Sequence, residues 1–185
     1  LARVSATGWD RGFDAKAGKL LLTYPDHRAT VYAVEFSADG KQAISCGGDN
    51  RIHLWHPTDQ GYEDKEMKKK KRQQIGNIGG FGGNTFDMTI VEGQIFACSA
   101  DKTARQYDAQ KRNQIRQYSG HQEWLYALSY HKASKRMATA SLNGQVRVWN
   151  VEAKGEKDLS VATFIAAPGY VPVDRTEQTS EGEAP

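Results

Sequence analysis

A histidine, a serine and an aspartate are the residues of this sequence whose types could act together in catalysis. His27, Ser45 and Asp49 lie close together along the chain, and a Ser-His-Asp set can activate a hydroxyl for nucleophilic attack. The other histidines considered follow none of the spacings that metal sites use: His53, His56 and His131. We expect no catalytic, metal or cofactor site among these residues.

The two cysteines and the glycine-rich loop carry no ligand signature either. Cys46 and Cys98 form no metal-binding spacing and no disulfide framework. They occupy equivalent positions in two copies of a repeat, so we expect two buried free thiols that lie well apart. The loop Gly79–Gly83 follows no parallel strand and opens no helix, which argues against a nucleotide site.

The composition is that of a globular protein with many tight turns. The 185 residues are 38% hydrophobic and 25% charged and include 18 glycines, which argues against a long disordered chain. No run of about 18 apolar residues is present to span a membrane. The net charge is +3, but the run Lys68–Arg72 alone holds five of the 25 basic residues. A uniformly basic nucleic-acid-binding surface is therefore not indicated.

A repeat becomes visible when the chain is aligned on its aromatic residues. The first copy combines Val31–Phe36, Ala43–Asp49 and Arg51–Trp55. The third copy combines Leu125–Tyr130, Met137–Asn143 and Gln145–Trp149, and a more divergent copy at 86–107 lies between them. Trp55, Tyr107 and Trp149 lie 52 and 42 residues apart, near the interval of about 40–45 residues expected for a four-stranded blade.

Each copy has the pattern of short strands joined by turns. Apolar residues alternate with period two, as at Ile52 and Leu54 or at Val146 and Val148, which predicts strands. Turn-forming segments such as Ser37–Gly40 separate them. No segment has a helical apolar stripe, so we predict an all-β protein.

These residues resemble the WD-repeat family. In that family a His, a Ser or Thr, an Asp and a Trp form a hydrogen-bonded tetrad within each blade, and two copies of the chain match the pattern. The implied structural tetrads are His27, Ser45, Asp49 and Trp55 in the first copy, and His121, Thr139, Asn143 and Trp149 in the third. The second copy keeps Asp101 but has Ala97, Tyr107 and a glycine near the His position.

The resemblance implies a partial β-propeller of four-stranded antiparallel blades, about three and a half WD repeats long. The expected order is the end of a preceding blade at 1–24 with an outer strand at 19–24, a WD repeat at 25–62, a basic insert and outer strand at 63–76, a degenerate WD repeat at 77–109, a WD repeat with the last outer strand at 110–166, and an acidic flexible tail at 167–185.

The number of repeats leaves three alternatives for the whole molecule, since propellers close with about four to eight blades. The chain is the closing segment of a larger ring, half of a ring completed by another chain, or a degenerate standalone fold. The polar, acidic ending favours the first alternative.

Loops that enter the innermost strands share one face of such a fold, and that face is the expected partner surface. The partner-binding candidates are Arg28, Tyr32, Phe81, Asn84, Lys102, Trp124 and Tyr126. Trp124 stands out because its counterparts in the other copies, aligned as Thr30 and Gly82, are not aromatic, and exposed aromatic residues often anchor interfaces. The alternative is that Trp124 packs against the neighbouring blade. The basic run Lys68–Arg72 is expected to begin a solvated outer strand, with an acidic partner as the alternative.

The resemblance implies a non-catalytic protein-interaction scaffold whose partners include proteins and the remaining blades of its own propeller. The alternative is an accessory propeller of a multidomain bacterial redox protein that carries a c-type cytochrome domain. Any haem motif would then lie upstream, since Cys-x-x-Cys-His does not occur in these residues. That alternative would place the chain in the periplasm, and a scaffold alone would fit the cytoplasm.

Overall fold

The chain folds into a series of small antiparallel sheets. The computed structural model describes residues 2–3, 10–13, 16–17, 19–57, 63–64, 69–70, 74–155 and 159–166. Every regular element among these residues is a strand, so the predicted all-β class and its antiparallel four-stranded blades are confirmed. The described residues include no helix with the length and apolar character that crossing a membrane requires.

Four sheets make up the main body, and we number them as blades in chain order. Blade 1 consists of β1 (Ala2–Arg3), β2 (Asp10–Phe13) and β3 (Leu20–Tyr24). Blade 2 consists of β4 (Val31–Phe36), β5 (Ala43–Gly47), β6 (Ile52–Trp55) and β9 (Gln74–Ile78). Blade 3 consists of β10 (Thr85–Val91), β11 (Gln94–Ser99), β12 (Ala104–Asp108) and β13 (Gln114–Tyr118). Blade 4 consists of β14 (Leu125–His131), β15 (Arg136–Ser141), β16 (Gln145–Asn150) and β17 (Ser160–Ile165).

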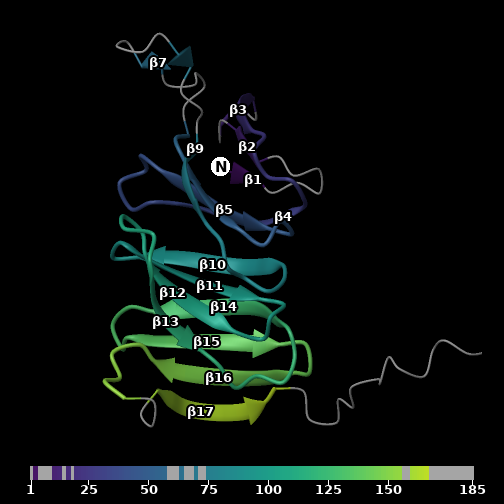
Figure 1. The fold of residues 1–185 in the computed structure, drawn as a ribbon, viewed down its shortest axis with the longest axis vertical. Coiled ribbons are helices and arrows are strands. Elements are labelled where there is room, and N and C mark those ends of the chain that lie inside the picture. The colour runs from purple at the N-terminus through teal and green to yellow at the C-terminus, as the bar shows by residue number, and fades with distance from the viewer. Residues whose placement is uncertain are drawn as a thin grey trace, which may run out of the picture.

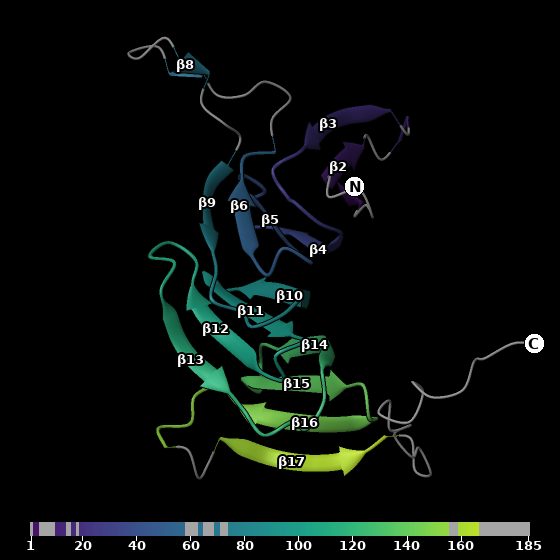
Figure 2. The ribbon, with the colours of Figure 1, turned by 45° about the vertical axis from the view of Figure 1, so that its right-hand side comes forward.

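Blades 2, 3 and 4 contain the first, second and third sequence copies, and they follow one another along the long axis of the molecule (Figure 1). In blades 3 and 4 the strands pair in simple chain order. The innermost strands β4, β10 and β14 contact one another in succession, and β17 lies at the far end of the array (Figure 2). The three innermost strands therefore place equivalent side chains of successive blades side by side.

Apolar side chains fill the spaces between blades. Blades 2 and 3 share a cluster that includes Ile44, Leu54 and Met88, and blades 3 and 4 share another that includes Phe96 and Trp149. Burial of such side chains is the main stabilising contribution to the stack. Cys46 and Cys98 are both buried in these clusters and no disulfide joins them, so the predicted burial of the two thiols is confirmed.

Tight turns need backbone conformations that most residues avoid. Glu92 and Gly93 both have positive φ, 53° and 75°, the pattern of a two-residue hairpin turn that matches strand twist. The turn after the second strand of each repeat also contains one positive-φ residue, Asn50, Lys102 or Gly144. The recurrence shows that the three repeats share turn geometry as well as strand order.

The basic run differs from its predicted place in blade 2. Lys69–Lys70 forms β8, which pairs with Glu63–Asp64 (β7) in a separate two-stranded ladder. The outer strand of blade 2 is β9, which pairs with β6 as far as Ile78. The basic insert therefore lies before this strand in the chain and does not form its first residues. The predicted tail at 167–185 lies outside the described residues.

Candidate functional site

The predicted tetrad of the first copy comes together inside blade 2. The entry loop before β4 supplies His27, whose Nδ1 lies 2.9 Å from Asp49 Oδ2 and whose Nε2 lies 2.8 Å from Ser45 Oγ. Trp55 Nε1 donates to the same Ser45 oxygen at 3.1 Å. With His27 Nδ1–H donated to the carboxylate, Nε2 accepts the Ser45 proton. Each of the four side chains thereby finds a hydrogen-bond partner within the blade.

A second histidine joins this cluster, although its spacing in the sequence matched no metal site and predicted no role for it. His53 is buried, and its ring stacks on His27 with centroids 3.9 Å apart and planes 26° apart. Its Nε2 lies 3.3 Å from Asp49 Oδ2, and its Nδ1 lies 2.9 Å from the Tyr24 hydroxyl. Burial would raise the pKa of Asp49, but the hydrogen bonds from His27 and His53 outweigh it and hold that pKa well below its usual range.

The residues of this cluster could be considered as metal ligands, since their donor atoms all lie within 4.8 Å of one another. The two imidazole planes are nearly parallel and stacked, and an imidazole nitrogen binds a metal along its lone pair, in the plane of the ring. In this cluster the facing nitrogens of His27 and His53 lie 2.9 Å and 3.3 Å from the same oxygen, Asp49 Oδ2, so the carboxylate already occupies the point on which they converge. The cluster therefore fits a hydrogen-bonded core better than a metal centre.

The same residues have the connectivity of a Ser-His-Asp triad, but not its accessibility. Ser45 has no exposed surface, and its oxygen already accepts the Trp55 indole N–H. A nucleophile must reach a substrate carbonyl beside an oxyanion site. Ser45 is enclosed between strands and cannot do so in this fold.

Blade 4 assembles only part of its predicted tetrad. His121 Nε2 and Trp149 Nε1 both lie 2.8 Å from Thr139 Oγ1. Asn143 is not joined to His121, because its Oδ1 accepts hydrogen bonds from the Ser141 hydroxyl and the Gln145 N–H. Burial, together with the positive charge of Arg147, lowers the pKa of His121 to about 4. The neutral ring therefore persists across the physiological range.

In blade 3 a pair of aromatic rings stands where the other two blades have the hydrogen-bonded tetrad. Phe81 is buried and packs on Tyr107 with ring centroids 5.8 Å apart, so it occupies the place that the histidines take elsewhere. Asp101 instead forms an ion pair with Arg105 at 2.7 Å, and the Arg105 guanidinium lies 4.7 Å from the Phe81 ring centre. Phe81 was predicted as a partner-binding residue, and its burial removes it from the exposed surface.

Aromatic side chains of three blades gather where the innermost strands begin. We call this set the aromatic face, and it consists of Tyr32, Phe86, Trp124 and Tyr126. Phe86 stacks on Tyr126 at 4.4 Å between centroids and lies 5.0 Å from Tyr32 and 6.4 Å from Trp124. Tyr32, Trp124 and Tyr126 remain 37%, 37% and 42% exposed. Exposed aromatic residues that already pack together lose little side-chain entropy on binding.

Sequence reasoning found three of these four residues and missed Phe86. The available signal was its position, second in its innermost strand, as Tyr32 and Tyr126 are in theirs. The backbone hydrogen bonds also correct the alignment of Trp124. Thr30, Asn84 and Trp124 each accept from the turn after the second strand of the repeat, so the counterpart in blade 3 is Asn84 rather than Gly82.

The other predicted partner residues lie around this face. Asn84 Nδ2 lies 3.4 Å from the Tyr32 hydroxyl and so links the loop before β10 to blade 2 at this face. Arg28 is exposed next to His27, and its backbone N–H lies 3.3 Å from Asp49 Oδ2. Lys102 is exposed in the turn after β11. Arg28 and Lys102 thus lie in segments next to the first residues of β4 and β10, the end of the strands at which the aromatic face lies.

Two stretches of the chain, residues 18–56 and 112–150, match the family model described as WD domain, G-beta repeat. Each stretch combines the outer strand of one blade with the first three strands of the next. The fold is similar to the crystal structure of the WD40 beta propeller domain of Doa1, with a TM-score of 0.72 over 91% of this chain and 51% of that one, at 17% sequence identity. That likeness concerns the fold alone.

Several curated proteins are similar in sequence. The chain is 24% identical over 155 residues to apoptotic protease-activating factor 1 of Rattus norvegicus, covering 68% of this chain and 12% of that protein. It is 24% identical over 170 residues to the ribosome biogenesis protein WDR12 homolog of Chlamydomonas reinhardtii, covering 83% and 38%. A chromatin assembly factor 1 subunit of Mus musculus is 24% identical over 157 residues, covering 78% and 27%. The chain thus spans well under half of the length of these relatives.

Proposed function

Because this chain carries WD repeats that fold as part of a β-propeller, we propose that it is a non-catalytic scaffold that binds a protein partner on its aromatic face. The observation that carries the proposal is the row of packed, partly exposed rings from three successive blades. Such side chains supply most of the binding energy where they occur at interfaces. The name of one similar protein, a subunit of chromatin assembly factor 1, fits a role in assemblies.

The proposed role as a scaffold without catalysis is supported by how the polar residues are used. The residues closest to a catalytic arrangement, His27, Ser45 and Asp49, are engaged with one another and with Trp55. Ser45 and His27 are buried. Their hydrogen bonds stabilise blade 2, which leaves binding as the function that the exposed side chains support.

The proposal includes a second partner, which is a further propeller blade that packs on blade 4. In blades 2 and 3 the side chains that face the next blade are buried, as at Ile78 and Tyr118, which hold equivalent positions on the outer strands. The corresponding residue of blade 4, Phe164, is 51% exposed. We propose that the remaining blades of a larger propeller, in the same or another chain, cover this face.

The aromatic face is tested with a matched pair of variants. Partners are captured from source cells on the immobilised chain and identified, and the dissociation constant of each purified partner is then measured. Trp124→Ala is expected to weaken binding about 30-fold, since a hot spot contributes about 2 kcal/mol or more.

The control is Phe36→Ala, which removes an aromatic side chain that is 43% exposed at the other end of an innermost strand. It should leave affinity unchanged. Equal effects of both variants, or a loss of stability in Trp124→Ala with binding retained, would contradict the proposal. Binding that disappears on nuclease treatment would instead assign the aromatic face to nucleic acid.

Two predictions from the sequence stay predictions. One is an acidic partner for the run Lys68–Arg72, and the other is a neighbouring c-type cytochrome domain. None of the contacts described above bears on either prediction.

A further inference from the structure

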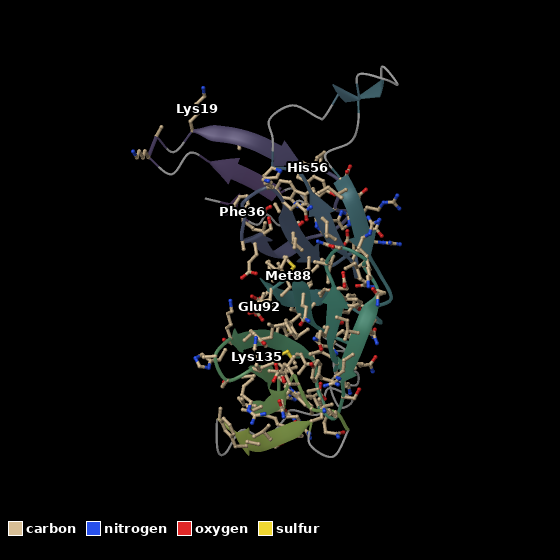
Figure 3. All side chains as sticks on the ribbon, turned by 90° about the vertical axis from the view of Figure 1, so that its left-hand side faces the viewer. Lys19, Phe36, His56, Met88, Glu92 and Lys135 are labelled. Atoms are coloured by element: carbon tan, nitrogen blue, oxygen red, sulfur yellow. The ribbon has the colours of Figure 1, made fainter. Side chains whose placement is uncertain are left out.

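A cleft of about 590 Å³ lies between blades 2 and 3. Its apolar lining comes from both blades and includes Leu54, Ile75, Ile90 and Ala109. The cleft opens beyond the ends of β4 and β10, as the participation of Asp39 and of the Glu92–Gly93 turn shows. The aromatic face lies at the beginning of these strands, so the two features occupy opposite sides of the array. Figure 3 shows Glu92 on the same side as Phe36 and Lys135.

The next interface of the same molecule explains why this one is hollow. Strand register makes Ile90 of blade 3 equivalent to Tyr130 of blade 4, since they pair with Ile95 and Met137. Between blades 3 and 4, Tyr130 stacks on Phe96 with centroids 4.8 Å apart and planes 16° apart. Between blades 2 and 3 the same two positions hold isoleucines, Ile90 and Ile44. The aromatic pair is therefore missing where the cleft lies.

A third position follows the same trend in the turn after the third strand. Ala109 donates its N–H to the Gly93 carbonyl as Val151 donates to Lys135, so the two residues are equivalent. Val151 packs in the apolar cluster between blades 3 and 4. Alanine fills less of the corresponding space between blades 2 and 3.

The outer edge of the interface is also built differently. Arg116 on β13 donates to the carbonyls of Val151 and Ala153 and so closes the edge between blades 3 and 4. Its equivalent on β9 is Gly76. At that edge Arg112 reaches back from blade 3 and donates to the Ile75 carbonyl at 3.1 Å. A Cβ on Gly76 would collide with the Arg112 guanidinium. Arg112 thus forms one wall of the cleft without filling it.

We propose that this cleft binds a peptide segment of a partner protein, which inserts one aromatic side chain between blades 2 and 3. The neighbouring interface shows which chemistry fits, because a tyrosine ring fills the equivalent space there against the same strand positions. An inserted ring would contact Leu54, Ile90 and Ala109. Clefts of about 300–1,000 Å³ with mostly apolar walls are typical of ligand sites.

Polar residues of the cleft suit the peptide that would carry the ring. The amide side chains of Gln42 and Gln110 belong to its lining and can both donate to and accept from a backbone. Asp39 also lines the cleft, and its Oδ1 accepts from the Ser37 hydroxyl and the Lys41 N–H. The opposite carboxylate of Glu92 is already paired with Lys132 and Lys135. A peptide bound here would leave the aromatic face free for the partner proposed above.

The first experiment uses p-cresol, which is the tyrosine side chain as a free molecule. The full chain is titrated with it while backbone amide chemical shifts are recorded. We expect saturable shifts centred on the amides of Ile90, Ala109 and Arg112. The matched variant carries Ile44→Phe with Ile90→Tyr, which copies the pair already present at the next interface. It should weaken p-cresol binding at least about ten-fold, a change of about 1.4 kcal/mol, without lowering the melting temperature.

The second experiment selects displayed random dodecapeptides on the wild-type chain and on the filled variant. Peptides with an aromatic residue should be enriched on the wild type alone, because other apolar surfaces are the same in both proteins. Equal enrichment on both, or shifts centred away from the cleft, would overturn the proposal. A filled variant that sediments as a smaller species than the wild type would also overturn it, by assigning the cleft to a second copy of this chain. If the double variant melts early, Ile90→Tyr alone serves both comparisons.

Discussion

At the scale of single residues, Ser45 holds the interior of blade 2 together. Its oxygen accepts from Trp55 Nε1, and its hydroxyl donates to His27 Nε2. Ser45→Ala would leave both groups buried without a partner, at a cost of about 1–3 kcal/mol for each. We expect the free energy of unfolding to fall by about 2–6 kcal/mol, measured by chemical denaturation.

The chain supplies its own control for this substitution. Thr139 takes the same position in blade 4 and makes the same two contacts. Ser45→Thr should therefore stay within about 1 kcal/mol of the wild type. An alanine variant as stable as the threonine variant would show that these hydrogen bonds contribute nothing net.

A pH dependence of stability follows from His121. Its pKa is lowered to about 4 in the folded protein by burial and by Arg147, whereas an unfolded histidine titrates near about 6.5. Between these values the unfolded chain binds a proton that the folded chain does not. Stability should therefore fall as the pH drops from about 6.5 to 4, by at most about 1.4 kcal/mol per pH unit for one proton.

The contribution of His121 is isolated by comparing how the free energy of unfolding changes with pH in two proteins. In His121→Phe, which copies Phe81 of blade 3, the stability measured by denaturation at pH 4.5 and pH 7 should differ less than in the wild type. Other titrating groups are common to both proteins and cancel. Identical slopes would mean that His121 does not titrate with the shift described.

At the scale of elements, a carboxylate joins the innermost strands of blades 3 and 4. Asp87 on β10 accepts the Leu128 N–H of β14 at 2.9 Å and the Met88 N–H of its own strand at 2.9 Å. Burial raises the pKa of Asp87, and the two N–H groups oppose that rise. Asp87→Ala should lower stability by about 1–3 kcal/mol, because two N–H groups lose their acceptor.

Hydrogen exchange locates this effect. The Leu128 amide should exchange faster in Asp87→Ala, while the Ile90 amide, which is bonded to Glu35 on β4, keeps its protection relative to global stability. Equal acceleration at both amides would indicate general destabilisation in place of a local link between blades.

The strands could be predicted because alternation and turn residues are local signals. Trp55 and Trp149 also identified the third strand of their blades, because each lies at the same distance along the chain from the turn before it. The role of Phe81 could not be predicted, because only the structure shows that this phenylalanine takes the position of the tetrad histidine. The cleft beside Ile90 depends on side-chain volumes from two blades, and no single segment of sequence contains that information.

At the scale of the whole molecule, blade 4 ends the described array with an apolar face. We call it the open face, and it comprises Ala138, Ala140, Val146, Val148 and Phe164. Register makes these residues equivalent to Phe96, Cys98, Ala104, Gln106 and Tyr118, all of them buried against blade 4. On the open face Phe164 is 51% exposed and the valines are only half-buried. Exposed apolar patches of this kind promote association.

Residues 1–185 on their own should therefore self-associate, with a sedimentation coefficient that rises with concentration. Val148→Lys places a charge in the middle of the open face and should shift the distribution towards monomer, while its effect on stability stays small because the site is only half-buried. Gln117→Lys adds the same charge on the exposed side of β13 and should leave association unchanged. A monomer at all concentrations for the wild type would mean that the open face needs no cover, and the proposal of further blades packing on β14–β17 would lose its physical basis.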